Sequence, residues 1–307
     1  MRPRDLKLAQ RIDTELVAFD RTTRPLPGVR KAARREAFRE QLLESIHRTR
    51  FIQIIRKRPI SDRRANPNDE LFDPLKAAIL QQRQGNIEEA FWLVFLFVHF
   101  GMHLRGGWRY VREIYGRTGE GRAWDWASTS QNVLEFRDWL HTNQTYLKRP
   151  GAGFGNHRKR ESLDARSPTG TGAVVESYIQ WVNPPRSHQQ LVAETLARNN
   201  GDAKAAFDDL YQSMDAVARF GRLGRFDYLA MVGKLELAPI SPGSPYLKGS
   251  SGPFKGAQLL FGNDGPADEL DGWATELGEK LGLGMQVVED ALCNWQKSPD
   301  SFVPFRG

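Results

Sequence analysis

Cysteine is nearly absent from this chain of 307 residues, which contains only Cys293. One cysteine can form no internal disulfide and is too few for an iron–sulfur cluster. We therefore expect a protein of a reducing compartment, the cytoplasm. His99 and His103 are spaced as two metal ligands on one helix face can be, but Gly101 weakens that helix and no Glu lies between them. We expect structural roles for both histidines and no bound metal.

Long hydrophobic runs are also missing. The most apolar stretch, 91–100 (FWLVFLFVHF), has about half of the ~20 residues that a membrane-spanning helix needs. Residues 1–20 are polar and charged throughout and show no secretory signal. The sequence therefore predicts no membrane partner and a buried core helix at 91–100.

A phosphate-binding loop of the Gly-Lys-Ser/Thr type is absent as well. The nearest strings, Gly116–Gly121 and Gly170–Gly172, lack the lysine, and Gly233-Lys234 is followed by leucine. A P-loop kinase is therefore unsupported, and we expect no nucleotide or other cofactor.

Positive charge is present in excess, and most of it lies near the N-terminus. The chain carries 44 Lys and Arg against 37 Asp and Glu, a formal net charge of +7. Residues 1–65 contain 18 basic and 8 acidic side chains, so this part sums to +10 and the rest to −3. A basic region suits a polyanion such as DNA, but a solvated helix face has the same composition. Charge alone leaves both interpretations open.

Helical periodicity dominates the sequence, and strand signals are scarce. Apolar residues recur every four positions in 31–50, as on an amphipathic helix. Asp73-Pro74 predicts the start of a helix that runs through Leu80. Further helices are expected at 91–100, 174–182, 189–198 and 202–220. The segment 51–55 alone has β character, and it continues a helical pattern, so the sequence predicts an all-α fold.

A Gly-rich, basic stretch at 151–172 is the clearest loop in the chain. It predicts two helical lobes flanking a cleft for DNA and a base: a basic N-terminal lobe, 1–150, and a second lobe, 151–307. Within the loop, consecutive polar and cationic residues suit recognition of an extruded base. These residues are Asn156, His157, Arg158 and Lys159. A solvated basic loop is the alternative.

A glycine turn followed by a helix lies at 245–261 (PYLKGSSGPFKGAQLLF). Two glycines around a short turn allow positive φ and close backbone approach, and N–H groups at the start of the next helix can hold a phosphate. The expected DNA contacts are Lys248, Gly249, Ser250, Ser251, Gly252 and Lys255. This segment resembles the hairpin of the helix-hairpin-helix DNA glycosylases.

In that superfamily the catalytic Asp follows the hairpin by about one helix and one loop. Asp271 stands at this place, 17 residues after Phe254, and we expect it to begin a helix over 271–282. A carboxylate there would stabilise the oxocarbenium character of a breaking glycosidic bond. A helix N-cap is the alternative role, and Asp264 and Asp268 are competing candidates without a bulky apolar residue before them.

Longer strings narrow the resemblance. FDPLKAAIL (72–80), NIEEAFWLVFLFVHFG (86–101), GFGNHRKRESL (153–163), GRFDYLAMVGKL (224–235) and GMQVVEDALCNWQKSP (284–299) are similar to the alpha-glutamyl/putrescinyl thymine pyrophosphorylase clade 3 family. The resemblance runs from Arg34 to the C-terminus. It implies a helix-hairpin-helix glycosylase-like fold and removal of alpha-glucosylated 5-hydroxymethylcytosine from double-stranded phage DNA in anti-phage defence, leaving abasic sites.

Three further expectations complete this picture. Phe254 occupies the position at which bifunctional members of the superfamily carry a lysine nucleophile, so a gapless alignment predicts a monofunctional enzyme, with Lys255 binding phosphate. One gap would instead give Lys255 that role. We expect a monomer. A DNA-binding protein without catalytic activity and an enzyme of hypermodified-thymine biosynthesis stay open as alternatives.

Overall fold

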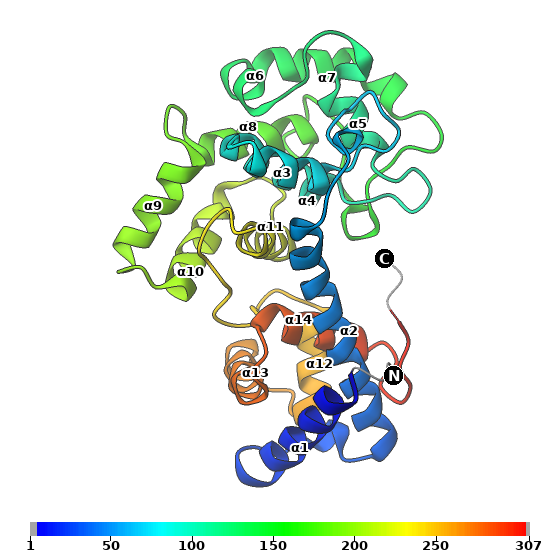
Figure 1. The fold of residues 1–307 in the computed structure, drawn as a ribbon, viewed down its shortest axis with the longest axis vertical. Helices are drawn as coiled ribbons and strands as arrows, with labels where there is room; N and C mark the ends of the chain where they lie inside the picture. Colours follow the sequence, from blue (N-terminus) through cyan, green and yellow to red (C-terminus); the bar gives the residue numbers. More distant parts are fainter. Residues whose placement is uncertain (1–4, 305–307) are drawn as a thin grey trace. The chain divides into compact units, whose positions relative to one another are not determined.

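The computed structural model describes residues 5–304, in which fourteen α-helices and no β-strand are present (Figure 1). The predicted all-α fold is confirmed. The chain divides into two compact units, one made of the described parts of Met1–Gln53 and Pro242–Arg306 and the other of Ile54–Ser241. This division differs from the expected lobes 1–150 and 151–307, because the loop at 151–172 lies inside the second unit and both ends of the chain belong to the first.

The first unit is held together by a core that joins the two ends of the chain. Its helices are α1 (Leu6–Thr22), most of α2 (Ala32–Lys57), α12 (Gly252–Phe261), α13 (Ala267–Leu281) and α14 (Met285–Trp295). Phe38 of α2 is fully buried, and its ring lies 5.0 Å from that of Trp295 on α14. An amphipathic helix must bury its apolar stripe against another element, so the N-terminal helices and α12–α14 form one unit.

The second unit surrounds the apolar helix α4 (Ile87–Phe100), ten of whose 14 residues are buried. Helices α3, α9 and α11 pack against α4. The prediction of a core helix at 91–100 is confirmed. The other helices of this unit are α3 (Pro74–Arg83), α5 (Arg109–Tyr115), α6 (Trp126–Gln131), α7 (Val133–Leu147), α8 (Thr171–Val182), α9 (His188–Arg198), α10 (Ala203–Ser213) and α11 (Arg222–Lys234).

Local signals set several of these boundaries. The Asp73 carboxylate accepts hydrogen bonds from the backbone N–H groups of Leu75 and Lys76, and Pro74 occupies the first helical position, as predicted. The helix expected over 202–220 ends earlier, at Ser213, and a 3₁₀ turn follows it. Among the described helices, none is both long and apolar enough to cross a membrane.

Candidate DNA-binding turn and catalytic carboxylate

Residues 245–251 form the tight turn that leads into α12. Ser250 donates both its backbone N–H and its hydroxyl to the carbonyl oxygen of buried Leu247, at 2.9 and 2.7 Å. Gly249 has a φ of +75°, which residues with a side chain rarely adopt. The predicted glycine turn is thus present, and α12 begins at Gly252, two residues before the expected start at Phe254.

Asp271 is tied to this turn by a hydrogen bond. The backbone N–H of Leu247 donates to Oδ1 of Asp271 at 2.8 Å, and the aspartate is half-buried beside fully buried Leu270. Helix α13 begins at Ala267, after Pro266, so Asp271 lies in its second turn. The expectation that Asp271 begins the helix is wrong, and with it the alternative that this residue is an N-cap.

The competing carboxylates lie in different surroundings. Asp264 is exposed in the loop between α12 and α13, and Asp268 is exposed in the first turn of α13. Lys248, an expected DNA contact, pairs with Asp268 at 3.3 Å, and both side chains are mostly exposed. Such a surface pair contributes little stability and can exchange for a phosphate at low cost.

The remaining turn residues differ in how they face solvent. Gly249, Ser251 and Lys255 are exposed, whereas Ser250 and Gly252 are half-buried. Phe254 packs against the core of the first unit, so Lys255 rather than Phe254 projects into solvent from the first turn of α12.

Close packing of α12 against α14 explains two glycines in this helix. A Cβ at Gly256 would lie 2.3 Å from the Leu292 carbonyl oxygen, and one at Gly252 would lie 2.8 Å from Sγ of Cys293. Gly252 therefore serves helix packing, a role that its position in the turn did not suggest.

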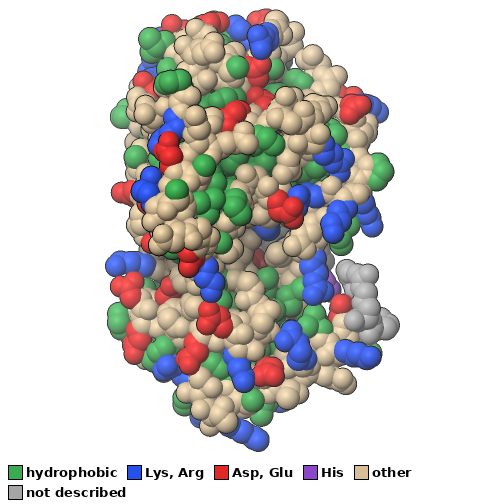
Figure 2. Space-filling view, turned by 60° about the vertical axis from the view of Figure 1, so that its left-hand side comes forward, with side chains coloured by type: hydrophobic (Ala, Val, Ile, Leu, Met, Phe, Trp, Pro, Cys, Tyr) green, Lys and Arg blue, Asp and Glu red, His purple; other side chains and the backbone are tan. Residues whose placement is uncertain are grey.

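Arginines of the basic N-terminal region pair with acids elsewhere in the first unit. Arg34 contacts Asp300 at 2.8 Å, Arg39 contacts Asp13 at 2.6 Å, and Arg48 pairs with Asp290. On the face drawn in Figure 2, Lys and Arg side chains are interspersed with Asp and Glu. Part of the N-terminal positive charge is therefore neutralised within the fold.

The loop proposed for base recognition contains one buried and three exposed residues. Asn156, His157 and Lys159 are exposed. Arg158 is only 6% exposed, and its Nε donates to the carbonyl oxygen of Val98 at 3.0 Å, which anchors the loop to α4. Its guanidinium is not part of the exposed face of this loop.

A buried carboxylate near this loop was missed by the sequence analysis. Burial raises the pKa of Asp227 on α11, while the charges of Arg158, His157, Arg222 and Lys234 lower it. Gly224, one turn earlier, makes room for Arg158, because a Cβ there would lie 2.7 Å from a guanidinium nitrogen. The string 224–235 carried family resemblance, but helical spacing alone could not place the loop beside it.

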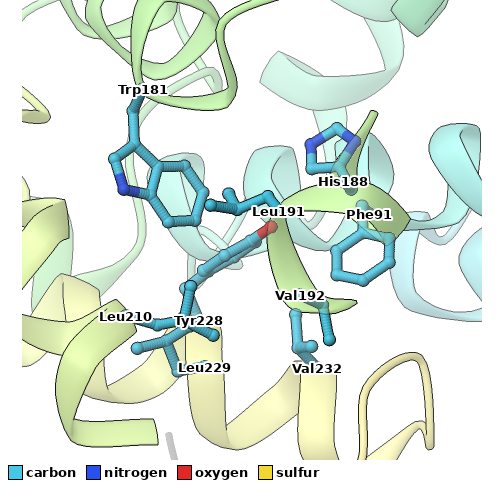
Figure 3. A pocket seen from close by; sticks show the side chains of 9 residues that line it. All are labelled: Phe91, Trp181, His188, Leu191, Val192, Leu210, Tyr228, Leu229 and Val232. Carbon is cyan, nitrogen blue, oxygen red and sulfur yellow. The ribbon is translucent and has the colours of Figure 1, made fainter. Parts of the chain in front are cut away.

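Four buried polar groups form a hydrogen-bonded chain inside the second unit. Nδ1 of His188 lies 2.7 Å from the Glu88 carboxylate, Nε2 lies 2.7 Å from the Tyr178 hydroxyl, and that hydroxyl lies 2.8 Å from the Tyr228 hydroxyl. Burial lowers the pKa of His188. A neutral ring that donates to Glu88 leaves Nε2 to accept from Tyr178. A cavity of about 10 Å³ adjoins the chain, between Trp181, Tyr228 and His188 (Figure 3). It is far too small for a nucleobase.

The two histidines considered as metal ligands have other partners. Nε2 of buried His99 lies 3.1 Å from the Thr171 hydroxyl, and Nδ1 of His103 accepts from the backbone N–H of Gly106 at 3.0 Å. In residues 5–304, no group of three or more His, Cys, Asp or Glu side chains is arranged to hold a metal ion.

The fold and this site define an all-helical protein in which a glycine turn is bonded to a half-buried carboxylate. The chain belongs to the alpha-glutamyl/putrescinyl thymine pyrophosphorylase clade 3 family, which it matches over residues 33–307. The predicted family membership is confirmed. No curated protein and no solved structure matched the chain. The family takes its name from chemistry on modified thymine, which indicates an enzyme.

Proposed function

We propose that this protein is a DNA glycosylase that hydrolyses the N-glycosidic bond of a bulky modified pyrimidine in duplex DNA and leaves an abasic site. The observation that carries the proposal is the 2.8 Å hydrogen bond from the Leu247 N–H to Asp271. It connects a turn suited to the DNA backbone with a carboxylate suited to the sugar.

The chemistry assigned to Asp271 is electrostatic. As the bond between C1′ and the base nitrogen breaks, the bonding electrons leave with the base and positive charge develops on the deoxyribose. A carboxylate in a fixed position stabilises that charge, and it can accept a proton from the water whose oxygen attacks C1′. The Leu247 hydrogen bond fixes one oxygen of Asp271 before substrate binds, so little reorganisation is needed.

The exposed face of the turn is the proposed DNA contact. Lys248, Ser251 and Lys255 lie on exposed positions around the start of α12, where backbone N–H groups and cations favour a phosphate. A phosphate would replace Asp268 as the partner of Lys248. Exposed Asn156, His157 and Lys159 are the proposed contacts to the extruded nucleotide.

The proposed substrate is alpha-glucosylated 5-hydroxymethylcytosine in phage DNA, and the proposed role is defence of a bacterium against phage. The resemblance of the strings at 72–80, 86–101 and 153–163 supports this choice. The family name favours a second candidate, an enzyme that acts on hypermodified thymine. The two candidates differ in the base that they recognise.

Purified protein incubated with three DNAs would separate the candidates. The DNAs carry glucosylated hydroxymethylcytosine, a hypermodified thymine or no modification, and the measurements are free base by mass spectrometry and abasic sites by an aldehyde-reactive probe. Our proposal predicts release and abasic sites on the first DNA alone. Products from the second DNA alone would favour the thymine enzyme, and binding without products would favour a non-catalytic DNA-binding protein.

A further inference from the structure

A sharp turn follows α4 and exposes an apolar side chain at its tip. The backbone N–H of His103 donates to the Gly107 carbonyl at 3.0 Å, and the N–H of Gly107 donates back to His103 at 2.9 Å. These two bonds enclose Leu104, Arg105 and Gly106. The Leu104 side chain is 86% exposed, the highest value among the large hydrophobic residues of the described chain.

This 103–107 turn is held rigidly. The His103 ring accepts the Gly106 N–H at 3.0 Å, and a Cβ at Gly106 would lie 2.1 Å from the Gly151 carbonyl oxygen. A Cβ at Gly153 would lie 3.0 Å from the same histidine ring. The turn therefore rests on the glycine-rich segment 151–155, and the direction of its tip is fixed before any partner binds.

Cations accompany the apolar tip. Arg105 is exposed beside Leu104, and Met102, at the base of the turn, is 58% exposed. Lys159 and Arg160 are exposed on the segment that continues from 151–155. Within residues 5–304, neither Arg105 nor these two cations form an ion pair with a carboxylate. An apolar point among unpaired cations suits a partner that combines a negatively charged backbone with stacked, apolar rings.

We propose that Leu104 is a wedge that enters the base stack of duplex DNA while Arg105, Lys159 and Arg160 contact the flanking phosphates. Apolar side chains inserted between base steps unstack and kink a duplex, and a flipped nucleotide leaves a gap that such a side chain can fill. This assignment rests on the proposed function for its target nucleotide. It makes Leu104 a positioning residue, because the side chain touches neighbouring bases rather than the breaking bond.

The size of the tip favours DNA over a protein partner. A stable protein interface buries about 800 Å² on each side. Leu104 and Met102 on one short turn cannot supply that area. Filling the space left by a single base needs only one side chain of this size.

The test compares Leu104→Ala with Leu134→Ala, which removes a leucine that is 68% exposed on α7. The probe is a duplex with glucosylated hydroxymethylcytosine beside 2-aminopurine, whose fluorescence rises when it is unstacked. Wild type and Leu134→Ala should raise the fluorescence on binding, and Leu104→Ala should not. Base release from the duplex should fall about tenfold in Leu104→Ala, as expected when unstacking is less favourable by about 1.4 kcal/mol, and should hardly change on single-stranded DNA.

The fluorescence arm does not require catalysis, so it separates this proposal from the proposed function. If wild type releases no base but raises the fluorescence through Leu104, the wedge stands and the glycosylase proposal fails. Equal fluorescence responses of wild type and Leu104→Ala would overturn the wedge. An equal loss of base release on duplex and single-stranded DNA would overturn it too. Thermal unfolding of both variants should match wild type, since both side chains are exposed.

Discussion

Replacing Glu89 by Gln should change how the stability of the protein depends on pH. Glu89 accepts a hydrogen bond from the Tyr115 hydroxyl at 2.8 Å and another from the Trp126 N–H at 2.7 Å. Burial raises the pKa of this carboxyl to about 7 from an ordinary value of 4.5, with the charge of Asp125 adding to the effect and the two hydrogen bonds opposing it.

The sign and size of the effect follow from linkage. Between pH 4.5 and 7 the folded protein keeps a proton that the unfolded chain loses, so rising pH lowers the free energy of unfolding. Each pH unit corresponds to about 1.4 kcal/mol, so the carboxyl costs about 3 kcal/mol above pH 7 that it does not cost below pH 4.5. Gln stays neutral and mimics the protonated acid. Glu89→Gln should therefore match wild type at pH 4.5 and exceed it by up to about 3 kcal/mol at pH 8.

The neighbouring Glu88 provides a control of opposite sign. Burial raises its pKa, but the hydrogen bond and charge of His188 and the backbone N–H groups of residues 188 and 189 outweigh burial, so the pKa is lowered overall. Glu88→Gln should destabilise the protein at pH 8. Urea unfolding of both variants from pH 4.5 to 8 measures these effects. An unchanged pH slope in Glu89→Gln would refute the reasoning.

Three other predictions concern packing, the buried chain and strand cleavage. Gly256→Ala should lower the free energy of unfolding by about 1–3 kcal/mol, because its Cβ meets a backbone carbonyl, whereas Gly272→Ala on the exposed face of α13 should raise it by up to about 1 kcal/mol. Tyr178→Phe should cost about 1–3 kcal/mol in urea unfolding, since both partners of the hydroxyl stay buried, and no loss would show that they find other partners. Borohydride should trap no protein–DNA adduct, and an adduct lost in Lys255→Ala would make that lysine a nucleophile.

Local sequence signals were sufficient for the helical class and for several boundaries. Asp73-Pro74 marks the start of α3 because the Asp side chain bonds to free N–H groups and Pro needs none at that position. The apolar run 91–100 predicted a core helix because it has no polar face. The glycine turn before α12 was recognisable because Gly249 must adopt positive φ.

Long-range contacts could not be predicted in the same way. The pairing of Phe38 with Trp295 joins segments more than 200 residues apart, and no periodicity encodes it. Similarly, Arg158 looked like a surface cation but is anchored to Val98, which lies on another helix. The early start of α13 had a readable signal, since Pro266 precedes acids at positions 268 and 269, in the first helical turn.

Base release by Asp271→Asn tests the central claim most directly. Asparagine keeps an oxygen that can accept the Leu247 N–H, so the fold and DNA binding should persist while the negative charge is lost. Asp268→Asn, the same change on an exposed carboxylate of the same helix, is the matched control. We predict that Asp271→Asn releases the glucosylated base at least about 100-fold more slowly than wild type, as expected for the loss of a transition-state contact, while Asp268→Asn stays near wild type. Release by Asp271→Asn at the wild-type rate would contradict the account.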